Sequence, residues 1–376
     1  MNSALPALSP ELLSQISSPS LVICRDRVLA NIDGMIRVAG DVRRLRPHCK
    51  THKMREIILL LIQRGITKHK AATIAEAEML ADAGATDVLL AYNMVGPNIA
   101  RIVKLAAKFP KCSFSVTADH PGPVKELSQA AAAEPGVTIG VMLDVNPGLH
   151  RTGVSPESPA ALEIYSQIAG SSGLQAAGFH VYDGQQRQAS RDERREAVQK
   201  EFQRVTALRD RCVAAGIAVP VMVCGGTPTF PVYAEMSDPT IELSPGTIIF
   251  HDSGYGNAFP DLDFQVAAFV LTRVISRPTT DRMTVDLGNK SVAADPPRGH
   301  RVVFPDVPEA VQDLHNEEHL VLVTPQAERY QPGDTLLGIP VHICPTSALH
   351  ANVTVVDAGR LVGEWPVTSR NRKLTV

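Results

Sequence analysis

The alternation of strand-like and helix-like patterns is the feature that most constrains the fold of this chain. From about residue 45 to residue 249, short apolar runs are separated by amphipathic stretches with apolar residues at helical spacing. Strands that alternate with helices form parallel βαβ units. The expected strands are 45–48, 71–73, 87–91, 113–118, 138–144, 176–182, 219–224 and 241–249. Eight such units predict an α/β fold with a (β/α)8 barrel of the TIM type. A doubly wound open sheet is the alternative, but no G-x-G-x-x-G motif follows the first strand.

The pattern changes after about residue 257. Short strand candidates with turn signals between them follow one another, and no convincing helix interrupts them. One of these candidates is the segment 341–344. We therefore predict two domains: a barrel over 25–256, followed by a C-terminal all-β domain. The β-rich domain is expected to combine 1–24 with 257–376 and to carry the candidate metal ligands.

Composition excludes several classes of function. The net charge of the 376 residues is −2 and the pI is about 6.6, which argues against a general binder of nucleic acid or of anionic membranes. Apolar runs such as 57–62 are too short to span a bilayer. Residues 1–20 lack the pattern of a secretory signal, and the six cysteines are scattered without close pairs. These features favour a cytoplasmic protein with free thiols.

A basic cluster at 46–53, with the sequence Arg-Pro-His-Cys-Lys-Thr-His-Lys, lies where the first strand meets the following helix. Lys50 is its central candidate. A lysine held at the mouth of a barrel can form a Schiff base with a carbonyl compound. A solvated basic turn is the alternative interpretation of the same residues.

Two glycine turns follow the seventh and eighth predicted strands. Gly225, Gly226 and Thr227 form the first turn, and Gly246 with Thr247 forms the second. In (β/α)8 barrels, phosphate is usually held by the loops after these two strands. Glycine lets backbone N–H groups approach an anion, and threonine adds a hydroxyl donor. The pattern predicts a phosphate site, and two ordinary turns are the alternative.

Arg151 and Tyr182 follow the fifth and sixth predicted strands, so both are expected at the barrel mouth. The arginine could hold the ring of an aromatic cofactor or a carboxylate, and the tyrosine could stack on a cofactor. The alternatives are a surface arginine on a loop and a partly buried core tyrosine.

His342 and Cys344 are two residues apart in a predicted strand, so their side chains are expected on one side of it. An imidazole and a thiolate supply half of a tetrahedral zinc site, with positions left for water and substrate. Sulfur favours zinc, while manganese and magnesium are the alternatives. A buried cysteine beside a strand histidine is the structural alternative.

These motifs, in this order, resemble those of the pyridoxal-phosphate enzymes with an alanine-racemase-type barrel, and more narrowly the D-threonine aldolase and D-serine dehydratase family. The most specific match is the cluster 46–53. The supporting matches are 72–78, 150–153, 225–227, 242–247, 252–256 and 342–346. The resemblance covers almost the whole chain, from about residue 19 to residue 367.

The resemblance implies a role for each candidate residue. Lys50 would form the internal aldimine with pyridoxal 5'-phosphate, and Arg151 and Tyr182 would contact the cofactor ring. The residues that would surround its phosphate are Gly225, Gly226, Thr227, Gly246 and Thr247. His342 and Cys344 would hold a divalent metal near the β-hydroxyl of the substrate. In one departure from many relatives, the loop after Tyr182 carries Gln185, Gln186 and Gln188 in place of histidine, and glutamine cannot act as a base.

The implied activity is a lyase reaction on small β-hydroxy-D-amino acids, with aldolase-like cleavage to glycine and an aldehyde as the favoured reading. The alternative is a dehydratase for D-serine or 3-hydroxy-D-aspartate, which forms a keto acid and ammonia from the same set of groups. A racemase needs no metal, so the pair at 342 and 344 counts against it. A non-catalytic pyridoxal-phosphate carrier would consist of the barrel alone. The oligomeric state stays open, with a homodimer among the alternatives.

Overall fold

The computed structural model describes residues 5–376, which form two compact units. The barrel unit consists of 36–50, 55–246 and 371–376, and the β unit consists of 5–35, 51–54 and 247–370. The predicted domain boundaries at 24/25 and 256/257 stay a prediction. Among the described residues, no helix is both long and apolar enough to cross a membrane.

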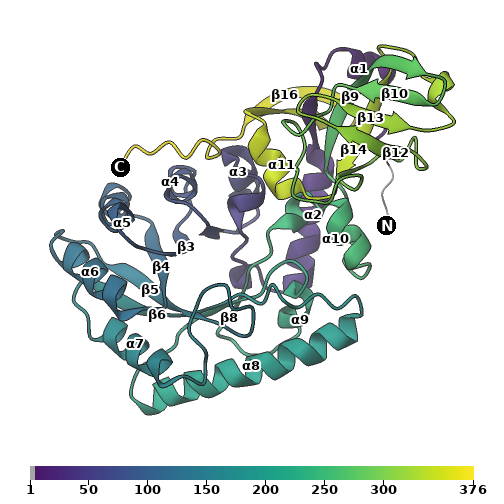
Figure 1. Ribbon diagram of the computed structural model, residues 1–376. Helices are drawn as coiled ribbons and strands as arrows, with labels where there is room; N and C mark the ends of the chain where they lie inside the picture. Colours follow the sequence, from purple (N-terminus) through teal and green to yellow (C-terminus); the bar gives the residue numbers. More distant parts are fainter. Residues whose placement is uncertain (1–4) are drawn as a thin grey trace. The chain divides into compact units, whose positions relative to one another are not determined.

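The barrel unit is built on a parallel sheet of seven strands in sequence order (Figure 1). The strands are β2 (Lys68–Ala71), β3 (Asp87–Asn93), β4 (Ser113–Ala118), β5 (Ile139–Val145), β6 (Leu174–Val181), β7 (Met222–Cys224) and β8 (Ile241–Leu243). Residues 45–48 close this sheet into a barrel. Leu45 forms a parallel bridge to Leu243 in β8, and His48 forms one to Lys70 in β2. The predicted (β/α)8 fold is therefore confirmed, with its first strand reduced to two isolated bridges.

Side chains from alternate strands fill the barrel interior. Leu89 in β3, Met142 in β5 and Val223 in β7 form one buried apolar cluster, as expected for the layers of a TIM-type barrel. A layer of charge lies near the amino-terminal ends of the strands. There the buried Arg46 pairs with Asp87 at 2.7 Å and with Glu242.

Helices follow the strands and lie on the outer side of the sheet, as α5, α6, α7 and α8 do in Figure 1. The helices of this unit are α3 (Arg55–Gln63), α4 (Ile74–Asp82), α5 (Pro97–Lys108), α6 (Pro121–Ala132), α7 (Pro159–Ala169), α8 (Arg191–Ala214) and α9 (Phe230–Ala234). Short 3-10 turns lie at η1 (Val42–Arg44) and η2 (Cys49–Thr51). Local sequence explains several helix starts. Proline opens α5, α6 and α7, where its missing N–H costs nothing.

The β unit holds a mixed sheet of nine strands. They are β1 (Ser20–Cys24), β9 (Ala268–Thr279), β10 (Arg282–Val285), β11 (Val302–Val303), β12 (Val311–His315), β13 (Leu320–Val323), β14 (Thr335–Pro340), β15 (Asn352–Asp357) and β16 (Arg360–Pro366). The other elements are α1 (Pro10–Ser14), η3 (Thr247–Ile249), α10 (Ser253–Ala258), η4 (Ala327–Arg329) and α11 (Ile343–Leu349), while α2 (Arg25–Ala39) contains residues of both units. The central strand β9 pairs with β1 and β14, and its Phe269 and Leu271 contribute to the apolar core.

The structure corrects three local predictions. The segment 341–344 is not a strand, because β14 ends at Pro340 and α11 begins at Ile343. The eighth barrel strand ends at Leu243 rather than at residue 249, and η3 follows it. The strand β12 was not predicted, and its exposed Val311 and Leu314 fit an edge position where periodicity is weak.

Candidate functional site

Lys50 lies in η2, directly after the segment that closes the barrel, and it is exposed. Backbone hydrogen bonds fix that segment from both sides. The N–H of His48 donates to the carbonyl of Pro245 at 2.8 Å, and the N–H of Lys70 donates to that of Pro47 at 2.9 Å. The N–H of Lys50 itself donates to Nδ1 of His48 at 3.3 Å. Lys50 therefore presents a free amine from a backbone held at the carboxyl end of the barrel strands.

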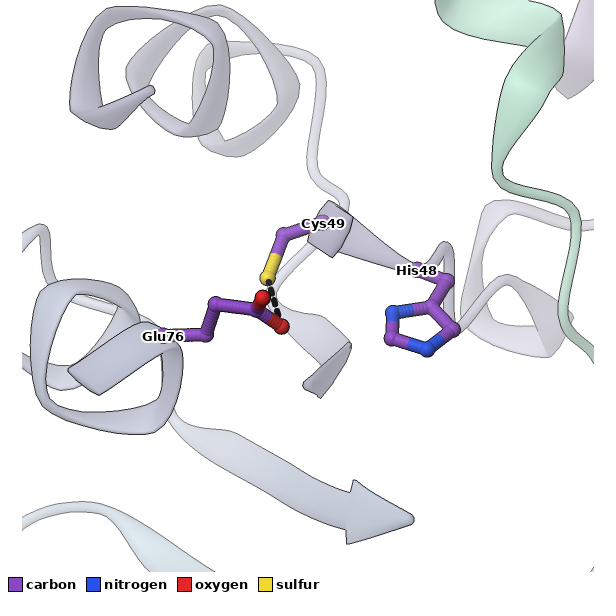
Figure 2. Close-up of side chains that lie close together, drawn as sticks. All are labelled: His48, Cys49 and Glu76. Carbon is purple, nitrogen blue, oxygen red and sulfur yellow. Dashed lines mark hydrogen bonds between the residues drawn. The ribbon is translucent and has the colours of Figure 1, made fainter. Parts of the chain in front are cut away.

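Side-chain hydrogen bonds of Cys49 and Glu76 hold this turn in place. The Cys49 thiol donates to Oε2 of Glu76 at 3.6 Å, as Figure 2 shows. The same oxygen accepts the N–H of Ala72 at 2.6 Å. The ligand atoms of His48, Cys49 and Glu76 lie within 4.8 Å of one another and are of types that bind zinc. Because hydrogen bonds already engage the thiol and the carboxylate, the geometry supports an anchoring role beside Lys50. Cys49 is buried, and its thiol is free of any disulfide, as predicted for these scattered cysteines.

Arg151 and Tyr182 are in direct contact. The guanidinium carbon of Arg151 lies 4.6 Å from the centroid of the Tyr182 ring, which is a cation–π distance. The backbone at two glycines also approaches the tyrosine closely, since a Cβ on Gly184 would come within 2.7 Å of the ring and one on Gly226 within 3.1 Å. The two residues predicted at the barrel mouth are therefore brought together, with the tyrosine ring packed among backbone.

The loop that carries Arg151 is fixed by its own sequence. The side-chain oxygen of Asn146 accepts the N–H groups of Gly148 and His150 at 3.1 and 3.0 Å. His150 adopts the left-handed conformation, with φ of 57°, and so reverses the chain just before Arg151. Gly153 has φ of +92°, and a Cβ there would meet the backbone of Asn146 at 2.9 Å. Asparagine and glycine thus set the direction in which Arg151 leaves the strand.

The glycine turns after β7 and β8 meet in the barrel unit. The N–H of Gly246 donates to Oγ1 of Thr227 at 3.2 Å, and the N–H of Gly226 donates to Oγ1 of Thr229 at 3.2 Å. Gly225 has φ of +71°, and a Cβ on it would come within 2.7 Å of the Thr229 hydroxyl. Four of the five predicted phosphate residues, Gly225, Gly226, Thr227 and Gly246, therefore lie together. The fifth, Thr247, belongs to the β unit, where its hydroxyl lies 3.5 Å from the sulfur of Cys344.

Two buried carboxylates lie at the carboxyl ends of β5 and β6. Asp144 pairs with Nδ1 of His180 at 2.8 Å, and burial lowers the pKa of that histidine. Asp183 accepts a hydrogen bond from Thr229 at 2.9 Å. Burial raises the pKa of Asp183 to about 7. The interior therefore holds one carboxyl group, that of Asp183, whose protonation changes near neutral pH.

The candidate metal ligands lie in the β unit. His342 precedes α11 and Cys344 lies in its first turn, yet the two side chains are hydrogen-bonded to each other. The bond with Cys344 raises the pKa of His342 to about 9. Burial opposes ionisation of Cys344, but hydrogen bonds from His342 and Thr51 outweigh burial and lower the pKa of the thiol. Nδ1 of His342 contacts Oδ2 of Asp295 at 2.5 Å. An imidazole, a sulfur and an orienting carboxylate form a donor set suited to zinc.

The Asp252 carboxylate holds the segment that carries these ligands. Its two oxygens accept the N–H groups of Tyr255 and Ile343, at 2.9 and 3.1 Å. A Cβ on Gly254 would come within 2.4 Å of the carbonyl of Val341, so only glycine permits this approach. The sequence 252–254 therefore sets the start of α11 from 91 positions away in the chain.

Comparison with known proteins identifies the family. The model of the alanine racemase N-terminal domain matches residues 23–254, and a model of a serine dehydratase domain matches residues 267–356. The chain belongs to the alanine racemase N-terminal domain family. It is 30% identical to a D-threonine aldolase from an Arthrobacter species, over 97% of this chain and 96% of that protein. It is 26% identical to the D-threo-3-hydroxyaspartate dehydratase of Delftia sp. strain HT23, over 94% of this chain and 97% of that protein. The crystal structure of a D-threonine aldolase from Filomicrobium marinum matches with a TM-score of 0.88 and 29% identity, over 96% and 98% of the two chains.

In this member of the alanine racemase N-terminal domain family, the structure adds residues that sequence reasoning missed. Asp295 contacts His342 from 47 positions away, and no local spacing signals that contact. Lys70 occupies the barrel interior, just before the strand predicted at 71–73. The one available signal was the alternation in β2, which places Lys68 and Lys70 on the same side of the strand.

Proposed function

We propose that the chain is a pyridoxal-phosphate- and divalent-metal-dependent lyase that acts on β-hydroxy-D-amino acids and cleaves a D-threonine-like substrate to glycine and an aldehyde. The observation that carries this proposal lies in the barrel unit. Lys50, the stacked pair of Arg151 and Tyr182, and the glycine turns all follow the carboxyl ends of parallel strands, where barrel enzymes place their active sites. The D-threonine aldolase and dehydratase relatives support the same reaction class.

The barrel residues fit pyridoxal phosphate. Lys50 offers an exposed amine for the aldehyde, and Arg151 with Tyr182 offers a planar face for the ring. Ser244 precedes the second glycine turn, and its buried hydroxyl has no hydrogen-bond partner within residues 5–376. Together with Gly225, Gly226, Thr227 and Gly246 it would hold the phosphate. When bound, the cofactor supplies an electron sink for negative charge at the substrate Cα.

The residues of the β unit fit a divalent metal. His342 and Cys344 would be the ligands, Asp295 would orient the imidazole, and a metal there would lower the pKa of a bound hydroxyl group. The sulfur ligand favours zinc over manganese or magnesium. Thr51 and Thr247 both contact the Cys344 sulfur within the β unit.

The second candidate is a dehydratase that forms a keto acid and ammonia from D-serine or 3-hydroxy-D-aspartate. The composition of the loop after Tyr182 supports this dehydratase candidate. Gln185 is bound to Glu201 at 2.9 Å, and Gln186 accepts a hydrogen bond from Gln188 at 2.9 Å, so this loop presents amides where cleavage of a β-hydroxy acid calls for a base. A dehydratase needs removal of the α-proton, for which the Lys50 amine is chemically suited.

Product analysis separates the candidates. The protein is incubated with pyridoxal phosphate and D-threonine, D-serine or D-threo-3-hydroxyaspartate, with zinc, manganese or a chelator. We expect glycine and acetaldehyde from D-threonine, and loss of this activity with the chelator. Formation of a keto acid and ammonia would instead show that the protein is a dehydratase and overturn the aldolase assignment. Metal-independent formation of the L-enantiomer would overturn both in favour of a racemase.

A covalent readout tests Lys50 without reference to turnover. Borohydride reduction of the cofactor-loaded protein should leave a pyridoxyl adduct on the peptide that contains Lys50. Lys50→Ala should abolish the adduct and the visible absorbance, whereas Lys53→Ala, a lysine of the same cluster, should retain both. An adduct that persists in Lys50→Ala would overturn the assignment.

A further inference from the structure

A second lysine lies inside the barrel. Lys70 is the third residue of β2, and only 3% of it is exposed. Lys68, two positions earlier on the same side of the strand, forms an ion pair with Glu242 of β8. The two lysines therefore project inward at successive levels, with Lys70 nearer the carboxyl ends of the strands.

The two levels differ in how their charges are neutralised. At the lower level, Arg46 and Lys68 are paired with Asp87 and Glu242. At the upper level, Lys70 has no hydrogen bond or ion pair for its amine among residues 5–376. Its Nζ lies over the face of Tyr182, 5.9 Å from the ring centroid. A buried ammonium without a carboxylate is costly, so such a lysine tends toward its neutral form.

The surroundings of Lys70 lower its pKa on balance. Burial is the main cause that lowers the pKa of Lys70 to about 7, and the charge of Lys50 adds to it. Asp183, Cys224 and Asp144 oppose this shift without reversing it. The remaining titratable neighbours are His48 on the closing segment and His180 on β6. Buried lysines with such properties serve as bases in other enzymes.

Asp183 is a further potential base of the barrel interior, since only one of its oxygens accepts a hydrogen bond, from Thr229. Several other groups there are engaged or unsuited. The three glutamines of the loop after Tyr182 carry no titratable group. His180 is held by Asp144 at 2.8 Å, and Nδ1 of His48 accepts the backbone N–H of Lys50. Lys70 is thus the unengaged amine beside Tyr182, the residue that stacks with Arg151.

We propose that Lys70 is a proton-transferring catalytic residue of the lyase, a role that rests on the function proposed above. Its neutral amine accepts the proton of the substrate β-hydroxyl, so that the O–H bond breaks and an N–H bond forms. The oxygen lone pair becomes the second bond of the aldehyde carbonyl, and the electron pair of the Cα–Cβ bond stays at Cα. The resulting ammonium then returns its proton to Cα, which yields glycine and restores the amine.

Lys70→Met and Lys70→Arg test this role, with Lys125→Met on the exposed part of α6 as the matched control. In protein without cofactor, the 13Cε resonances of the lysines are titrated from pH 5 to pH 10. One resonance should titrate with a midpoint near 7 and be missing from Lys70→Met. A Lys70 midpoint above 9 would overturn the proposal.

The holoenzyme supplies the second readout. Lys70→Met should keep the pyridoxyl adduct on Lys50 but lose about 10²–10⁴-fold in kcat, as expected for a missing general base, and should lose the acid limb of the pH profile. Lys70→Arg keeps a permanent charge in the same place and should be equally impaired, while Lys125→Met should match wild type. Activity within threefold of wild type in Lys70→Met, with an unchanged pH profile, would overturn the role of Lys70 alone. Absence of an adduct on Lys50 in the wild-type protein would instead overturn the proposed function.

Discussion

The guanidinium of Arg151 lies over the ring of Tyr182, 4.6 Å from its centroid, although the two residues follow different strands of the barrel. The contact gives the first prediction. Tyr182→Ala removes the face on which Arg151 rests and opens the space beside Gly184 and Gly226. We expect the affinity for pyridoxal phosphate to fall by about 5–30-fold, on the order of 1–2 kcal/mol. Absorbance titration measures the dissociation constant. Tyr182→Phe keeps the ring and should bind almost as well as wild type, and equal loss in both variants would contradict the stacking role.

The turn after β7 gives a prediction about backbone space. Gly225 needs a positive φ, and an added Cβ would come within 2.7 Å of Thr229 and 2.9 Å of Tyr233. Gly225→Ala should lower both the free energy of unfolding and the affinity for inorganic phosphate. Gly216→Ala is the control, since Gly216 has a similar φ of +79° but open space around it. Its cost should be limited to about 1–2 kcal/mol of backbone strain with no loss of phosphate affinity. Isothermal calorimetry and denaturant unfolding measure the two quantities, and equal phosphate binding by both variants would sink the prediction.

Asp295 is expected to strengthen metal binding at His342. Their contact at 2.5 Å fixes the orientation of the imidazole, and loss of such a partner typically costs 10–100-fold in metal affinity. Asp295→Asn should weaken zinc binding by about that factor, whereas His342→Ala should abolish it. Metal content after dialysis against graded chelator concentrations provides the measurement. The control Asp306→Asn, at an exposed position of the same unit, should retain the metal. Equal retention of zinc by Asp295→Asn would show that the Asp295 carboxylate has no part in the site.

The ion pairs of Arg46 predict a large effect on stability. Arg46 is 2% exposed and holds Asp87 and Glu242, so Arg46→Met leaves the partly buried Asp87 without its cation and the buried Glu242 with Lys68 alone. Breaking such a network typically costs about 3–5 kcal/mol of unfolding free energy. Urea unfolding followed by circular dichroism tests this value. Arg43→Met removes the exposed pair with Asp41 and should change little. Similar urea midpoints for the two variants would show that the barrel interior tolerates the loss of the Arg46 cation.

His69 predicts how stability depends on pH. It is fully buried, its ring nitrogen contacts the carbonyl of Ile66 at 3.1 Å, and burial lowers the pKa of His69 to about 3. Below pH 6.5 the imidazole of His69 therefore binds a proton in the unfolded chain but stays neutral in the folded chain. The free energy of unfolding falls as the pH falls toward 3. The slope is at most about 1.4 kcal/mol per pH unit.

His69→Gln should reduce that slope between pH 6 and pH 4, while exposed His300→Gln should not. Urea unfolding at several pH values measures the difference between each variant and wild type. Parallel slopes for wild type and His69→Gln would rule out the buried histidine as the cause.

Local periodicity was enough to place most barrel elements. The strand predicted at 113–118 coincides with β4, and the strand predicted at 138–144 coincides with β5 within one residue. The prediction for 341–344 was wrong because its alternation of apolar and polar residues is equally compatible with the start of a helix. Pro345 is tolerated in the first turn of α11, and the carboxylate of Asp252 binds the N–H of Ile343. That contact is absent from any local window of the sequence.

Periodicity and residues close together in the chain were sufficient to predict the barrel, the basic segment at its first strand and the types of residue that follow each strand. Tertiary structure alone decided which of those residues meet. The stacking of Arg151 on Tyr182, the contact of Asp295 with His342 and the burial of Lys70 without a carboxylate all join distant positions. The physical reason is that a side chain's charge state and contacts depend on what the fold packs around it, and a strand pattern states only which way the side chain faces.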